Sequence, residues 1–120
     1  MGTVLIVDDS RTSRKILEAI LIEGGLEVIG QAADGQQGVD LYQELKPDVV
    51  TMDITMPVMD GVEALAKIKE IDPKAKVVMV TAAGQKSKII DALKLGVDDF
   101  LTKPYESEEI VSTIMRVIDK

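Results

Sequence analysis

Hydrophobic residues along the chain fall into short continuous runs separated by longer segments with a different pattern. Continuous runs of apolar or β-branched residues, rather than alternating ones, are typical of strands that are buried on both faces, as in a parallel sheet. Five such runs, the last weaker than the others, are Val4–Val7, Val28–Ala33, Val49–Met52, Val77–Thr81 and Phe100–Thr102. We therefore expect five buried parallel strands.

The segments between and after these runs have apolar residues three or four positions apart, which predicts amphipathic helices. The periodic positions are Ile16, Leu17, Ile20 and Leu21; Leu41, Tyr42 and Leu45; Leu65 and Ile68; Ile89, Ile90 and Leu93; and Ile110, Val111, Ile114, Val117 and Ile118. Glycine or proline ends the first four segments, at Gly24-Gly25, Lys46-Pro47, Asp72-Pro73 and Gly96. On the fourth helix we expect Ile89, Ile90 and Leu93 to fill the inner face.

Strand and helix alternate five times, which predicts an α/β fold with a doubly wound, five-stranded parallel sheet and right-handed crossovers. The 120 residues contain no linker rich in Pro, Gly or Ser, so we expect a single domain over residues 1–120. In sheets of this kind ligands bind outside the carboxyl ends of the strands, where the strand order reverses. Functional residues are therefore expected at that edge.

The composition argues against several classes of function. Acidic residues outnumber basic ones by 21 to 14, and the net charge of −7 opposes binding to nucleic acid. No apolar stretch is long enough for a membrane span, and acids follow the first apolar run directly, so we expect a cytoplasmic protein with no membrane contact. The chain has no His and no Cys, so any chemistry depends on carboxylates, hydroxyls and amines.

Polar residues stand where four of the five predicted strands end. They are Asp8 and Asp9, Asp53, Thr81 and Lys103. Taken singly each has an ordinary explanation, such as a helix cap at Asp9 or Ser10. Together they place three carboxylates at one edge, where mutual repulsion favours a bound cation. Oxygen ligands without His or Cys select a hard ion, and Mg²⁺ is the best candidate.

An ammonium and a hydroxyl beside such a cation suit the binding of a phosphoryl group. In phosphoryl transfer the protein mainly positions the group and offsets the charge on its oxygens, as Lys103 and Thr81 would do. Asp53, at the end of the central strand, is then the natural nucleophile. A carboxylate is ionised at neutral pH and can attack phosphorus without a histidine base.

Four motifs carry a family resemblance: VDDS at residues 7–10, MDITMPVMDG around Asp53, VTA at residues 80–82 and LTKP at residues 101–104. In order and spacing the chain resembles a response regulator receiver domain over nearly its whole length. It is most similar to the CheY-type single-domain chemotaxis regulators. The resemblance implies the flavodoxin-like fold with strand order 2-1-3-4-5.

The resemblance also implies that Asp53 accepts a phosphoryl group from a phosphohistidine on a sensor histidine kinase similar to CheA. Because this chain has no His, the donor must be another protein. Such a protein is not an enzyme in the usual sense, since it catalyses only its own phosphorylation and dephosphorylation. A separate phosphatase is a further expected partner, and we expect a monomer.

The implied Mg²⁺ ligands are the Asp9 and Asp53 carboxylates, Asp8 through water, and the backbone carbonyl of Thr55. Thr81 and Lys103 would contact the phosphoryl oxygens. The Lys103-Pro104 peptide bond would be cis, as is usual in the family.

The family's switch also has matching residues here. In that mechanism Thr81 moves toward the phosphoryl group and Phe100 rotates into the space, which alters the surface of the fourth helix, fifth strand and fifth helix. The partner at that surface would be the flagellar motor switch or another output protein. The alternative for Phe100 is a plain core residue. Lys86, Lys88 and Lys94 are candidates for the partner-binding face, although a solvated surface explains each one singly.

Two residues depart from the best-known chemotaxis pattern. Thr55 replaces an Asn two positions after the acceptor, and Ala83 stands two positions after Thr81, where an acid is frequent. In the family both positions flank the path of the attacking water, so the resemblance implies that these two residues affect the lifetime of the phosphorylated state.

Three alternative functions share part of this pattern. A phosphorelay intermediate, which passes its phosphoryl group to another protein, has nearly the same sequence signature. A flavodoxin-like electron carrier needs a hydroxyl- and glycine-rich phosphate loop and aromatic stacking, whereas this chain has DDSRT after its first strand and no Trp. An aspartyl-phosphate phosphatase would resemble D-x-D at the nucleophile, but Ile54-Thr55 follows Asp53.

Overall fold

Five parallel strands form one sheet in the computed structural model, which describes residues 2–120. Their order is β2-β1-β3-β4-β5, so the predicted fold class and strand order are confirmed. The strands are β1 (Thr3–Val7), β2 (Glu27–Ala32), β3 (Val49–Asp53), β4 (Val77–Thr81) and β5 (Asp99–Thr102). The chain reverses direction across the sheet between β1 and β3, and this is the place where the fold class predicts a ligand.

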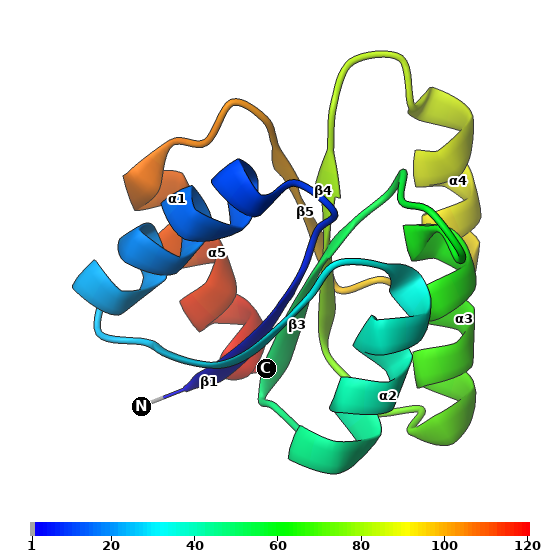
Figure 1. Ribbon diagram of the computed structural model, residues 1–120, viewed down its shortest axis with the longest axis horizontal. Coiled ribbons are helices and arrows are strands. Elements are labelled where there is room, and N and C mark those ends of the chain that lie inside the picture. The colour runs from blue at the N-terminus through cyan, green and yellow to red at the C-terminus, as the bar shows by residue number, and fades with distance from the viewer. Residues whose placement is uncertain (1) are drawn as a thin grey trace.

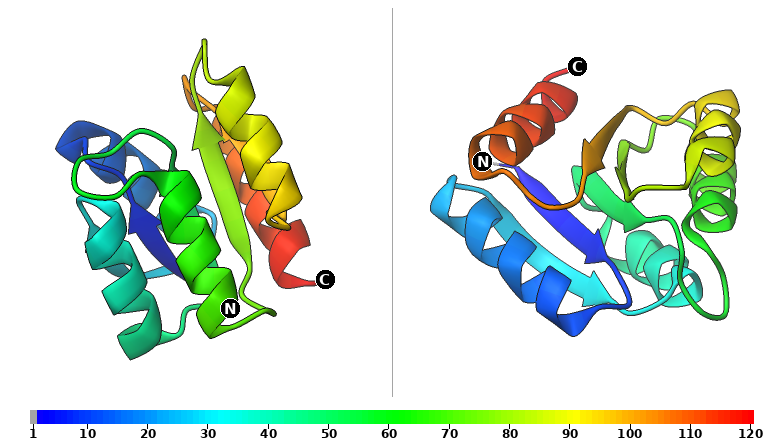
Figure 2. Two further views of the ribbon diagram at one scale, coloured as in Figure 1. Left: turned by 90° about the vertical axis from the view of Figure 1, so that its right-hand side faces the viewer. Right: turned by 90° about the horizontal axis from the view of Figure 1, so that it is seen from above.

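Helices cover both faces of the sheet (Figure 1). They are α1 (Arg11–Glu23), α2 (Gly35–Leu45), α3 (Gly61–Ile71), α4 (Lys86–Lys94) and α5 (Ser107–Ile118). Figure 2 shows α1 and α5 together on one face and α2, α3 and α4 on the other. Within residues 2–120, no helix has both the length and the apolar character needed to cross a membrane.

Two hydrophobic cores result, one on each face of the sheet. Leu5 and Val7 of β1 belong to the core beneath α2, α3 and α4. Val4 and Ile6 of the same strand belong to the core beneath α1 and α5. Successive side chains of a strand point to opposite faces, so a strand between two helical layers needs apolar residues at every position. This requirement explains the continuous apolar runs.

Local sequence signals set the helix ends. Of the two candidates Asp9 and Ser10, it is the side chain of Ser10 that caps α1, by accepting a hydrogen bond of 3.2 Å from the N–H of Ser13. Asp60 caps α3 in the same way, with a hydrogen bond of 2.9 Å from the N–H of Glu63. The strand limits differ from the predicted runs by one residue in places: β3 includes Asp53, and β5 begins at Asp99.

The prediction for the inner face of α4 is wrong in part. Ile89 packs against the core and Ala92 is fully buried, but Ile90 and Leu93 are 46% and 59% exposed. The prediction considered only large side chains. A small residue such as Ala92 lets the helix lie close to the core, and the larger residues then point to its outer side.

Candidate functional site

The ends of four strands bring the predicted polar residues to one edge of the sheet. Val7 pairs with Met52, so Asp8, directly after β1, and Asp53, the last residue of β3, follow at the same level. Thr81 pairs with Thr102, and Lys103 follows β5 directly. Residues from the beginning, middle and end of the chain therefore meet at this edge because the strands are parallel and in register.

Three carboxylates form a cluster at this edge. Asp8, Asp9 and Asp53 each offer an oxygen, and these oxygens all lie within 4.8 Å of one another. Asp8 is only 2% exposed and Asp53 is 9% exposed, whereas Asp9 is open to solvent. Buried carboxylates at this spacing require positive charge nearby.

Lys103 supplies part of that charge. Its Nζ lies 3.0 Å from Asp8 Oδ2 and 3.6 Å from Asp53 Oδ2. The loop after β5 turns through the predicted cis bond between Lys103 and Pro104. Three carboxylates and one ammonium leave a formal charge of −2, which a single divalent cation would balance. The all-oxygen donor set and the close spacing fit a hard ion such as Mg²⁺.

The backbone around Asp8 is fixed by hydrogen bonds. Asp8 Oδ1 accepts one from the N–H of Ser10 at 2.8 Å, and the backbone carbonyl of Asp8 accepts one from Arg14 Nη1 at 2.6 Å. Arg14 thus helps to position the backbone of Asp8, a role that the sequence pattern did not indicate. These bonds hold the Asp8 side chain toward Lys103 and Asp53.

The pKa of Asp53 is raised to about 6. Burial is the largest cause, and the negative charge of Asp8 adds to it, while Lys103 and the N–H of Ile54 oppose the shift. Asp53 is therefore ionised at neutral pH, but its charge is less stable in the folded protein than in the unfolded chain.

We expect Asp53→Asn to raise the free energy of unfolding at pH 7 by about 2 kcal/mol in metal-free buffer. The folded pKa of Asp53 lies above its ordinary value of 3.8, so the wild-type protein loses stability as the pH rises from about 4 to about 6. The Asn variant lacks that loss. Urea unfolding across this pH range measures the free energy of unfolding of both proteins. If the difference between them does not grow as the pH rises, the raised pKa of Asp53 is contradicted.

The other predicted residues lie nearby in different settings. The Thr81 hydroxyl is buried and donates to the backbone carbonyl of Leu101 at 3.3 Å, so it is directed toward β5. Phe100 is partly buried and packs against the core beneath α2, α3 and α4. Thr55 is exposed in the loop after β3. The structure thus gathers Asp8, Asp9, Asp53 and Lys103, with Thr81 and Thr55 at the margin.

Two residues near the edge were not predicted. Gln85 bridges the loops that follow β3 and β4, through bonds to Thr55 and Ala82. The hydroxyl of Tyr105 is buried without a hydrogen-bond partner within residues 2–120. Burial raises the pKa of Tyr105, and the charges of Asp8 and Asp53 add to the effect. Neither residue has a periodicity or spacing that would reveal its place from sequence.

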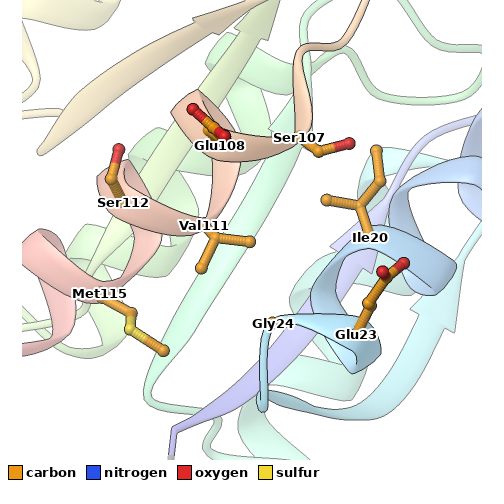
Figure 3. Close-up of a pocket in the computed structure, with 8 residues that line it drawn as sticks. All are labelled: Ile20, Glu23, Gly24, Ser107, Glu108, Val111, Ser112 and Met115. Carbon is orange, nitrogen blue, oxygen red and sulfur yellow. The ribbon is translucent and has the colours of Figure 1, made fainter.

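A hollow of about 520 Å³ lies elsewhere, between α1 and α5. Figure 3 shows Ile20 facing Val111 and Met115 across it. Its lining includes none of the polar residues at the strand ends. It is therefore separate from the carboxylate cluster.

The family described as response regulator receiver domain matches residues 4–115. The chemotaxis protein CheY of Thermotoga maritima is 46% identical over 114 residues, which cover 95% of each chain. Protein CcdB of Bacillus subtilis is 47% identical over 118 residues, which cover 98% of each chain. Among solved structures, a complex of CheX, CheY, BeF3 and Mg²⁺ from Borrelia burgdorferi contains a chain that aligns with a TM-score of 0.92 and 39% identity, covering 99% of this chain and 90% of that one.

Proposed function

The chain belongs to the response regulator receiver domain family, and from this premise we propose that it is a two-component signalling protein phosphorylated on Asp53. The donor is a phosphohistidine on a sensor histidine kinase similar to CheA. The protein acts on no separate substrate and promotes only its own phosphorylation and dephosphorylation. The observation that carries the proposal is the meeting of Asp8, Asp53 and Lys103 at one edge of the sheet.

In the proposed reaction an oxygen of the Asp53 carboxylate attacks phosphorus. The P–N bond to the donor imidazole breaks, the electron pair leaves with the imidazole, and an acyl phosphate forms on Asp53. The pKa of about 6 supports this role, because the carboxyl group needs no base at neutral pH. Lys103 would offset the charge of the phosphoryl oxygens from its position 3.6 Å from Asp53 Oδ2.

The residues that would hold Mg²⁺ are Asp8, Asp9, Asp53 and the backbone carbonyl of Thr55. The spacing and charge of the three carboxylates support this set. The ion supplies positive charge opposite the phosphoryl oxygens when it is bound. Asp9 and Asp53 would hold the ion directly, and Asp8 would hold it through water.

The output would pass through Thr81 and Phe100 to the surface formed by α4, β5 and α5. Exposed Ile90 and Leu93 on α4 give this surface an apolar component that a protein partner would cover. Similarity to CheY proteins favours the flagellar motor switch as the partner. A phosphorelay intermediate would share every step up to phosphorylation of Asp53. It would differ only in passing the phosphoryl group on to another protein. The cytoplasmic location and the monomeric state stay predictions.

The proposal is tested by incubating the protein with a small phosphodonor such as acetyl phosphate. We expect the intact mass to increase by one phosphoryl group with Mg²⁺ present. With EDTA in place of the metal, uptake should fall at least a hundredfold, because the excess negative charge then repels the donor. Equal uptake with and without Mg²⁺ would contradict the proposal.

A further inference from the structure

The side chain of Gln85 connects the two loops beside Asp53. Gln85 is the residue before α4, and its Oε1 accepts a hydrogen bond of 2.7 Å from the backbone N–H of Ala82. Its Nε2 donates to Thr55 Oγ1 at 3.0 Å. A backbone N–H can only donate, so the carboxamide oxygen must face Ala82 and the nitrogen must face Thr55. We call this pair of hydrogen bonds the Gln85 clasp.

The clasp lies across the carboxyl edge of the sheet. Ala82 follows Thr81 at the end of β4, and Thr55 comes two residues after Asp53 at the end of β3. These two strands are neighbours, with Asp53 paired to Val80. The clasp therefore spans the two loops that flank the nucleophile.

The N–H that Gln85 holds is directed toward the Asp53 side of β4. The carbonyl of Thr81 accepts a hydrogen bond of 2.9 Å from the N–H of Lys103, on the β5 side. Backbone groups of successive strand residues point to alternate sides, so the N–H of Ala82 points to the β3 side. In this structure the clasp occupies that donor, and the Thr81 hydroxyl is also engaged, by Leu101.

We propose that Gln85 is a positioning residue whose clasp restrains the loops after β3 and β4 in the unphosphorylated state and must open when a phosphoryl group is added to Asp53. This inference rests on the proposed function. A phosphoryl group on Asp53 adds acceptor oxygens between the two loops and competes with Gln85 for the N–H of Ala82. An interaction present in only one of two states shifts the equilibrium toward that state, so the clasp opposes phosphorylation.

The consequence is a gain of function when the clasp is removed. Met has nearly the shape of Gln but cannot form either hydrogen bond, so Gln85→Met frees the N–H of Ala82. We expect Gln85→Met to bind beryllofluoride with Mg²⁺ about fivefold more tightly. We also expect it to take up the phosphoryl group of acetyl phosphate about fivefold faster. The free energy of a fivefold change is about the net contribution of one hydrogen bond. Damage to the fold would produce a loss instead.

The experiment follows beryllofluoride titrations through the amide signals of the labelled protein. Gln43→Met is the matched control, since Gln43 is exposed near the end of α2, which leads to the start of β3 at the opposite edge of the sheet. Thr55→Val removes one of the two hydrogen bonds and should give a smaller gain. In the double variant the gain should not exceed that of Gln85→Met alone, because both changes open the same clasp. Gln85→Ala repeats the test should the Met variant be unstable.

The outcomes separate the clasp from the proposed function. Tighter binding in Gln85→Met, with no change in Gln43→Met, supports the clasp. Unchanged or weaker binding in Gln85→Met and Gln85→Ala overturns it and leaves phosphorylation of Asp53 intact. Failure of the wild-type protein to bind beryllofluoride or to be phosphorylated would instead overturn the proposed function.

Discussion

Replacing Lys103 with Met is expected to lower the free energy of unfolding by about 3 kcal/mol at pH 7 in metal-free buffer. The ammonium lies 3.0 Å from the Asp8 carboxylate, whose side chain is only 3% exposed. Removing one partner of a buried pair leaves the other charge uncompensated, which costs several kcal/mol. Asp53 then also loses the positive charge that offsets its repulsion by Asp8. Urea unfolding in EDTA measures the effect.

Lys88→Met is the matched control for this prediction. It breaks the Lys88–Asp60 ion pair, whose side chains are 47% and 31% exposed, and such pairs contribute about 1 kcal/mol or less. Mg²⁺ should restore more stability to Lys103→Met than it adds to the wild-type protein, since the variant has a more negative site. Equal losses in the two variants, or no extra gain from Mg²⁺, would show that Lys103 does not neutralise the cluster.

Gly61→Ala is expected to destabilise the protein by about 3 kcal/mol and to reduce phosphorylation of Asp53 at least tenfold. Gly61 is the first residue of α3, and its N–H donates to the carbonyl of Ile54 at 2.6 Å. A Cβ at residue 61 would overlap the backbone carbonyl of Asp53. Backbone cannot move aside as a side chain can, so either α3 or the end of β3 must shift, and the nucleophile would move with it.

Gly96→Ala distinguishes this steric effect from a general cost of replacing glycine. Gly96 has a φ of 82°, and a Cβ there would meet nothing within 4 Å. Gly96→Ala should lower the free energy of unfolding by about 1 kcal/mol, because alanine is strained in the left-handed backbone conformation, and it should leave phosphorylation unchanged. Similar losses of phosphorylation in the two variants would rule out the close approach of Gly61 to Asp53 as the cause.

The sequence predicted the sheet and the carboxylate cluster because both depend on simple patterns. A strand between two helical layers must be apolar at each position, as in Val4 to Val7, and parallel strands must end at one edge. Asp8 and Lys103, which are 95 positions apart, could therefore be predicted to lie near each other, and they form an ion pair.

The parts that the sequence did not predict depend on side-chain packing. The orientation of α4 is set by how closely Ala92 approaches the core, which no count of large apolar residues reveals. The bonds of Gln85 depend on the shape of two loops and on which backbone donors the sheet leaves free. The roles of Thr81, Phe100 and Thr55 stay predictions, because they concern a bound metal ion or a phosphorylated state.

The most direct test of the account is to identify the phosphorylated residue. After incubation with acetyl phosphate and Mg²⁺, borohydride reduction converts an aspartyl phosphate to homoserine, which peptide mass spectrometry locates. We predict homoserine at residue 53 in the wild-type protein and none in Asp53→Asn. Homoserine at Asp8 or Asp9, or uptake that persists in Asp53→Asn, would contradict the central claim that Asp53 is the phosphoacceptor.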